Sequence, residues 1–224
     1  MNRLPVYIEI LFIFGTLLTI LLLYKSTNYS RPSIIIVLSW LALQSIVSLS
    51  GFYTVTNVRP PRFALLLLPP IAFIASMFFT KNGKRLIDGY DVKTLTLLHI
   101  VRIPIEFTLY WLFLQNVIPK IMTFEGRNFD ILCGLTAPFV YYFGYVKNML
   151  SRNVLIAWNV VCLLLLVNIV ITAVLSAPLP FQQFAFDQPN IAMLYFPYTL
   201  LPCCLVPIVL LAHLVAIRRL LIIQ

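Results

Sequence analysis

Three ionisable side chains lie close together in the stretch "HIVRIPIE", residues 99–106. On a helix, His99, Arg102 and Glu106 are spaced i, i+3 and i+7 and share one face, and Tyr110 extends that face by one more turn. A lone charge near the centre of a membrane helix costs about 2.5 to 3.5 kcal/mol, so we expect Arg102 and Glu106 to pair with each other. Such a face predicts a site that binds protons or a small charged solute.

A second polar stretch, "FEGRNFD" at residues 124–130, follows this face. The apolar part after it, "ILCGLTAPFVYYFGYV", has 16 residues, and a membrane-crossing helix needs about 20. We therefore expect the span to begin at residue 124 and its polar side chains to point inward near the outer interface. Arg102 and Arg127 would anchor anions, and Glu106, Glu125 and Asp130 would accept protons or cations. The complete predicted pocket consists of His99, Arg102, Glu106, Tyr110, Glu125, Arg127, Asn128, Asp130 and Glu9.

The composition places this polar face inside a membrane protein. Of the 224 residues, 61% are hydrophobic and 10% are charged. Soluble domains have about 45 to 50% and about 25%, respectively. Apolar runs recur along the whole chain, so we predict an all-α, polytopic transmembrane bundle in a single domain, residues 1–224. We expect about seven spans, at 6–24, 34–54, 63–80, 94–117, 124–146, 154–176 and 193–217.

The formal net charge of +9 indicates basic loops that meet anionic lipid rather than nucleic acid. Seven spans put the two ends of the chain on opposite sides, and the basic residues then divide 5 against 10. The amino-terminal side holds Arg3, Arg59, Arg62, Lys120 and Arg127, and the other side holds Lys25, Arg31, Lys81, Lys84, Arg85, Lys93, Lys147, Arg152, Arg218 and Arg219. This bias predicts an outer N-terminus and a cytoplasmic C-terminus in a plasma membrane or bacterial inner membrane.

Prolines gather in two of the predicted spans. The third carries Pro69 and Pro70, and the seventh carries Pro197, Pro202 and Pro207. Each proline lacks a backbone donor and kinks or loosens its helix. Two interpretations remain open: the prolines only shape the helices, or they open the backbone where it lines a cavity.

The leading functional hypothesis is a membrane protein that binds and moves a small solute or protons through the predicted pocket. Three alternatives remain open. The charges could form a structural ion-pair network that locks the helices together. The chain could be an intramembrane enzyme acting on a lipid or isoprenoid-like substrate, with Glu106, Glu125 or Asp130 as acid or base. It could also be a structural or sensory membrane subunit.

Partners and cofactors follow from the same residues. His213 is predicted at a depth similar to that of His99, but two histidines without further ligands do not predict a haem or metal site, so we expect no cofactor and no metal. The sequence holds no standard nucleotide-binding or hydrolase motif. The expected partners are membrane lipids, the solute or proton, and either a second copy of the chain or another membrane subunit.

Overall fold

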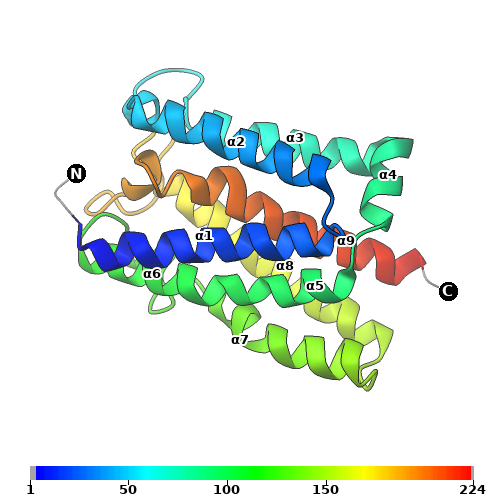
Figure 1. Ribbon diagram of the computed structural model, residues 1–224. Coiled ribbons are helices and arrows are strands. Elements are labelled where there is room, and N and C mark those ends of the chain that lie inside the picture. The colour runs from blue at the N-terminus through cyan, green and yellow to red at the C-terminus, as the bar shows by residue number, and fades with distance from the viewer. Residues whose placement is uncertain (1–3, 223–224) are drawn as a thin grey trace.

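The computed structural model describes residues 4–222, which form a bundle of helices without strands. The α-helices are α1 (Val6–Ser26), α2 (Arg31–Leu49), α3 (Ala64–Phe79), α4 (Lys81–Asp88), α5 (Val92–Leu98), α6 (Arg102–Leu114), α7 (Ile131–Val140), α8 (Arg152–Leu175) and α9 (Val206–Ile222). Short 3-10 turns are η1 (Phe52–Thr54), η2 (His99–Val101), η3 (Lys120–Met122) and η5 (Ala192–Leu194), and π-helical turns are η4 (Tyr141–Val146) and η6 (Leu201–Leu205). The first helix begins at one end of the bundle and the last finishes at the other (Figure 1).

Five helical stretches are long and apolar enough to cross a membrane. They are Val6–Ser26, Arg31–Leu49, Val92–Leu114, Arg152–Leu175 and Leu201–Ile222. A sixth arises if α3 and α4, which are bent by 93° at their junction, form one span. The all-helical prediction is thus confirmed with five candidate spans, or up to six, where the sequence predicted about seven.

The segment predicted as a fifth span, 124–146, differs most from expectation. Its helix begins only at Ile131 and ends at Val146, so the apolar stretch keeps the short length seen in the sequence. Residues before it form turns, because the Asn128 side chain accepts a hydrogen bond from the backbone N–H of Asp130 at 3.1 Å. An Asn that bonds the backbone two residues on competes with helix formation. The polar stretch therefore folds as a loop beside the bundle.

Pro104 shapes the helix that carries the predicted site. Because it has no N–H, the carbonyl of Ile100 cannot accept the usual bond from residue 104, and the chain makes the 3-10 turn η2 just before α6. α5, η2 and α6 nevertheless continue as one span, Val92–Leu114, close to the predicted 94–117. Asp91 begins it by accepting the N–H groups of Lys93 and Thr94, both at 3.2 Å.

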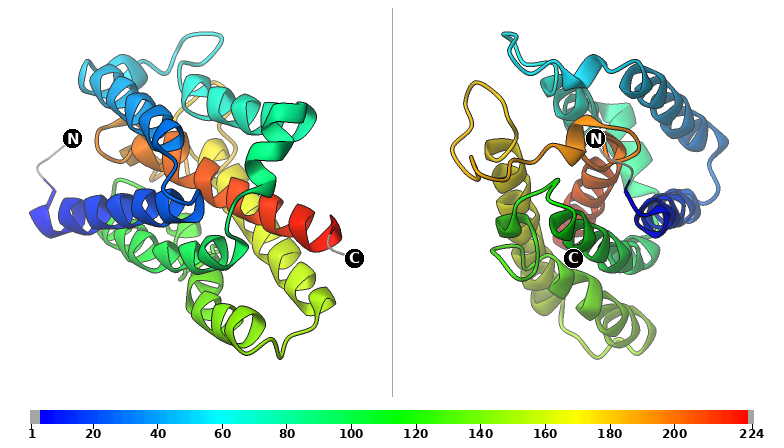
Figure 2. Two further views of the ribbon diagram at one scale, coloured as in Figure 1. Left: turned by 45° about the vertical axis from the view of Figure 1, so that its right-hand side comes forward. Right: turned by 90° about the vertical axis from the view of Figure 1, so that its left-hand side faces the viewer.

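The bundle packs around α9. Figure 2 shows this helix with α1, α3, α5 and α8 around it. Within an apolar stretch of 18 residues in each candidate span, 56% of the residues are buried in Leu201–Ile222 and 50% in Val92–Leu114, against 17% in Arg31–Leu49. The largest apolar core joins residues of α1, α6, α8 and the last span, including Phe12, Leu109, Leu166 and Val209. The predicted polar face thus lies on one of the two most buried spans.

Candidate functional site

Arg102 is the centre of a buried polar cluster. Its side chain is only 3% exposed, and it lies at the start of α6, directly after η2. One Nη atom donates to Asp130 Oδ1 at 2.5 Å, and the other lies 2.9 Å from Nε2 of His213 on α9. The guanidinium therefore joins the loop before α7 to the central helix of the bundle.

The hydrogen bonds of His213 identify its protonation state. Arg102 can only donate, so Nε2 of His213 accepts. Nδ1 of the same ring lies 2.9 Å from Oδ1 of Asn159 and donates to it, while Nδ2 of Asn159 donates to the carbonyl of Leu155. His213 is therefore a neutral imidazole with its proton on Nδ1.

His99 stacks on this imidazole. The two ring centroids are 3.8 Å apart and the planes differ by 13°, and the indole of Trp158 meets the His99 ring edge-on at 5.6 Å. His99 is fully buried, and both of its ring nitrogens lack a hydrogen-bond partner among residues 4–222. The cluster therefore contains an imidazole with free proton-accepting capacity beside one that is fully bonded.

Glu106 lies on the other side of Arg102, one turn further along α6. The residue is 2% exposed, and Nδ2 of Asn128 donates to its carboxyl at 2.7 Å from each oxygen. Asn128 is itself fully buried, and its Nδ2 also lies 3.0 Å from the carbonyl of Met122. Within residues 4–222 no ion pair reaches Glu106.

The expected pairing of Arg102 with Glu106 is therefore replaced by a pairing of Arg102 with Asp130. The loop before α7 brings Asp130 against the guanidinium, whereas Asn128 from the same loop takes the Glu106 carboxyl. Gly134 allows this approach, because a Cβ atom there would lie 2.9 Å from Cγ1 of Ile103 and 3.3 Å from Cβ of Arg102. The first turn of α7 can thus rest directly on α6.

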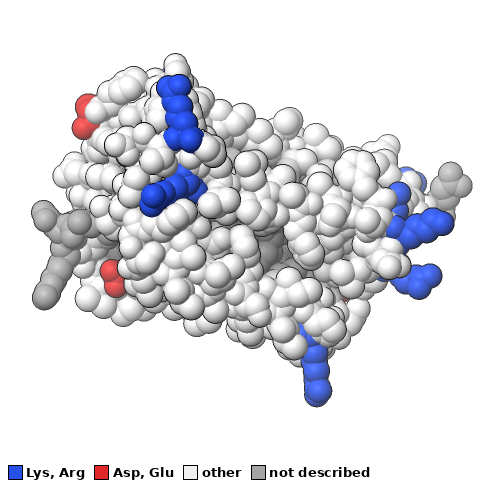
Figure 3. All heavy atoms as spheres, turned by 90° about the horizontal axis from the view of Figure 1, so that it is seen from above, with Lys and Arg blue, Asp and Glu red and all other residues white. Residues whose placement is uncertain are grey.

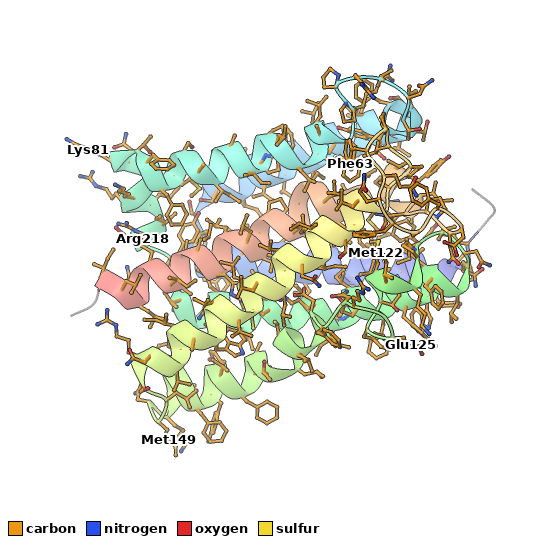
Figure 4. The ribbon with its side chains drawn as sticks, turned by 180° about the vertical axis from the view of Figure 1, so that it is seen from behind. Phe63, Lys81, Met122, Glu125, Met149 and Arg218 are labelled. Carbon is orange, nitrogen blue, oxygen red and sulfur yellow. The ribbon has the colours of Figure 1, made fainter. Side chains whose placement is uncertain are left out.

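The other predicted pocket residues lie outside the cluster. Glu9 is partly exposed on α1, and Tyr110 stacks on Phe124 with ring centroids 4.9 Å apart. Glu125 is exposed at the end of the molecule opposite Lys81 and Arg218 (Figure 4).

Glu125 and Arg127 lie on the surface of the loop before α7. The carboxylate of Glu125 pairs with Lys120 at 3.8 Å. The Arg127 side chain is exposed, and its backbone carbonyl accepts a bond from Asn168 at 3.0 Å. Of the nine predicted residues, the structure brings together His99, Arg102, Glu106, Asn128 and Asp130.

Two members of the cluster, His213 and Asn159, were absent from the predicted pocket. The similar depth of His213 and His99 along their spans was the available signal for His213. The stacking of the two rings could not be derived, because it depends on how α9 is rotated about its own axis. No group of three metal-ligating side chains occurs in the part of the chain that the structure describes.

Comparison with known protein families assigns the chain to a family. A family model with the description "Domain of unknown function (DUF8737)" matches residues 61–221. The chain belongs to this family. The region matched to DUF8737 runs from before α3 into the last turn of α9 and contains the whole buried cluster, while α1 and α2 precede it. No curated protein and no solved structure matches the chain.

Proposed function

We propose that this DUF8737 chain is an integral membrane protein that binds protons or a small solute at the buried cluster and moves them across the membrane. The observation that carries the proposal is Glu106. Its carboxyl is buried, its side-chain partner is the amide of Asn128, and no cation pairs with it among residues 4–222. Ionisable groups at such depth are functional candidates.

The charge balance of the cluster supports exchange at this carboxyl. Arg102 and Asp130 neutralise each other, and His213 is neutral. A charged Glu106 would then leave one uncompensated negative charge in a buried site, which is costly. A proton or a small cation removes that cost, so uptake of either is favourable at this position. His99, with both ring nitrogens free, offers a further acceptor in the same cluster.

For the topology we propose seven passes in a plasma membrane or bacterial inner membrane, with the N-terminus outside and the C-terminus in the cytoplasm. In this arrangement α3 forms one pass, α4 belongs to the basic loop that follows it, and α7 with η4 forms a short pass. The opposite positions of the start of α1 and the end of α9 support an odd number of passes (Figure 1). The excess of basic residues in the loops on one side supports the orientation.

Proton flux into liposomes tests the function. The purified chain is reconstituted with a trapped pH-sensitive dye, and flux is driven by a potassium diffusion potential. We expect flux with the unmodified chain and its loss in Glu106→Gln, because the amide keeps the shape and cannot take up a proton. Infrared difference spectra provide a second readout, since the C=O stretch of a protonated carboxyl should vanish in the same variant.

Glu125→Gln is the matched control, because this carboxylate is exposed and forms a surface ion pair with Lys120, outside the buried cluster. It should keep the flux of the unmodified chain. Circular dichroism and size-exclusion chromatography establish that both variants are folded. Undiminished proton flux in a folded Glu106→Gln protein would refute the proposal. Equal losses of flux in Glu106→Gln and Glu125→Gln would mean that the flux does not depend specifically on the buried site.

A further inference from the structure

An apolar cavity lies on the opposite side of α9 from the charged cluster. Its volume is about 340 Å³, and its walls come mainly from α2, α3, η6 and α9. Ile36 and Val37 line one side, Phe73 and Met77 a second, and Ile208 and Leu211 a third. No charged side chain lines it, and its size falls within the range of about 300 to 1,000 Å³ that is typical of ligand pockets.

The backbone of η6 explains why α2 stands away from α9 here. Pro207 has no N–H, so the carbonyl of Cys203 cannot accept the usual helical bond from residue 207. The indole of Trp40 donates to that carbonyl instead, at 2.9 Å, and fixes α2 at the length of a tryptophan side chain from the central helix. Pro69 and Pro70 of α3 form another part of the wall. The Trp40 hydrogen bond and the prolines of α3 and α9 thus help to hold the walls of the cavity in place.

A polar hollow adjoins one end of the apolar cavity. This second space, about 430 Å³, shares Thr27, Leu86 and Tyr90 with the first, and its remaining walls are Ser30, Asn82, Arg85 and Gly89. It lies where the chain bends by 93° from α3 into α4.

The polar hollow is basic. Arg85 is exposed and has no ion pair within residues 4–222, while Asp88, one turn later, is held by Arg218 through two bonds of 2.9 Å. Lys81 and Lys84 on the same helix add to the positive charge. Figure 3 shows Lys and Arg side chains gathered at this end of the molecule, and a hollow in the middle of the same apolar face.

We propose that the two adjoining cavities hold an anionic membrane phospholipid, with an acyl chain in the apolar cavity and the phosphate at Arg85 and Asn82. The apolar walls match a hydrocarbon chain, and the unpaired guanidinium at the mouth matches a phosphate. Basic residues at a membrane surface also concentrate anionic lipid nearby. The site is independent of the proposed proton site, because none of the residues of the charged cluster lines either cavity.

Trp40 reports on this lipid directly, since it lines the apolar cavity. In a full-length chain carrying Trp111→Phe and Trp158→Phe it is the single tryptophan. Its fluorescence is measured in micelles titrated with phosphatidylglycerol or phosphatidylcholine, each with brominated acyl chains that quench tryptophan on contact. We expect phosphatidylglycerol to quench at about fivefold lower concentration, the effect of one basic side chain near the headgroup.

The matched pair of variants is Arg85→Gln and Lys81→Gln. Both remove one positive charge from exposed positions of α4, and only Arg85 lines the hollow. Arg85→Gln should bring the two lipids to within about twofold of each other, whereas Lys81→Gln should keep the preference. A second readout is native mass spectrometry, in which retained phosphatidylglycerol should be lost from Arg85→Gln alone.

Three results would overturn the proposal. Equal quenching by both lipids in the parent chain would mean that the mouth does not select an anionic headgroup. An equal loss of preference in both variants would mean that the surface charge of α4 acts without a defined site. Retention of a fatty acid or a peptide in place of phospholipid would assign the cavity to another occupant. Activity at Glu106 is not measured in any of these experiments, so the proton proposal stands or falls separately.

Discussion

Exchanging Arg102 for Gln tests whether one guanidinium holds the buried cluster together. The side chain is 3% exposed and donates to Asp130 and to His213. Removing one partner of a buried ion pair leaves the other charge uncompensated, at a cost of about 3 to 5 kcal/mol. The lost bond to His213 adds about 1 kcal/mol. We therefore expect Arg102→Gln to lower the free energy of unfolding by about 4 to 6 kcal/mol.

The double variant Arg102→Gln with Asp130→Asn distinguishes lost charge compensation from lost packing. It removes both charges and leaves two amides of similar size, so it should cost about 2 kcal/mol or less. The free energy of unfolding is measured by circular dichroism in mixed micelles with a rising fraction of sodium dodecyl sulfate. The effects of the two single substitutions should therefore sum to far more than the effect of the double variant.

The surface pair Lys120 and Glu125 provides the control cycle, since its side chains are 58% and 44% exposed. Substituting both by Gln should change stability by about 0.5 kcal/mol or less, with no coupling beyond that. If Arg102→Gln were within about 1 kcal/mol of the unmodified chain, or if its effect simply added to that of Asp130→Asn, the reasoning from charge compensation would be wrong.

Three further predictions concern single positions. His99→Phe should change the free energy of unfolding by about 1 kcal/mol or less, because His99 makes no hydrogen bond within residues 4–222. His213→Phe should cost about 2 to 4 kcal/mol, because it leaves the buried Arg102 and Asn159 groups that it now bonds without that partner. Unfolding in mixed micelles measures both. Gly134→Ala should cost about 1 to 3 kcal/mol in the same assay, since its Cβ would lie 2.9 Å from a side-chain atom and 3.2 Å from a backbone atom of α6. Asn28, in the sequon "NYS" after α1, should stay unglycosylated in microsomes if that loop is cytoplasmic, and a gel shift reversed by endoglycosidase would contradict the topology.

The helix that carries the polar face could be predicted well from the sequence. The span Val92–Leu114 follows from an apolar run of sufficient length, and its 3-10 turn follows from Pro104. The start of the span predicted at 124–146 was harder to predict. The apolar run of 16 residues is too short to cross a membrane, so the prediction extended the helix into the polar residues before it. In the structure the helix stays short, because the Asn128 side chain accepts from the backbone N–H of Asp130 and donates to the Glu106 carboxyl. Such a choice depends on partners that are distant along the chain.

The partner of Arg102 could not be chosen from spacing alone. Helical geometry brings the side chain at i+4 within reach, which favoured Glu106. Asp130 competes for the same guanidinium from 28 residues away, and Asn128 from the same loop takes the Glu106 carboxyl. Spacing identifies which residues can meet on one helix, whereas tertiary packing decides which of them do. The sequence therefore placed Arg102, Glu106 and Asp130 in one polar region, predicted the wrong partner for Arg102, and included Glu125 and Arg127, which the structure leaves exposed.

The rearranged pairing makes the cluster better suited to a change of charge than the predicted one. If Arg102 paired with Glu106, Asp130 at the edge of the bundle would be the carboxyl without a cation. In the observed arrangement the uncompensated carboxyl is Glu106, which lies near the middle of the candidate span Val92–Leu114. One proton on Glu106 brings Arg102, Asp130 and Glu106 to zero net charge, and its release brings them to minus one. A small cation can replace that proton, whereas a solute anion could enter only while Glu106 is protonated. For the exchange that we propose at this site, the charge balance favours a proton or a small cation over an anion.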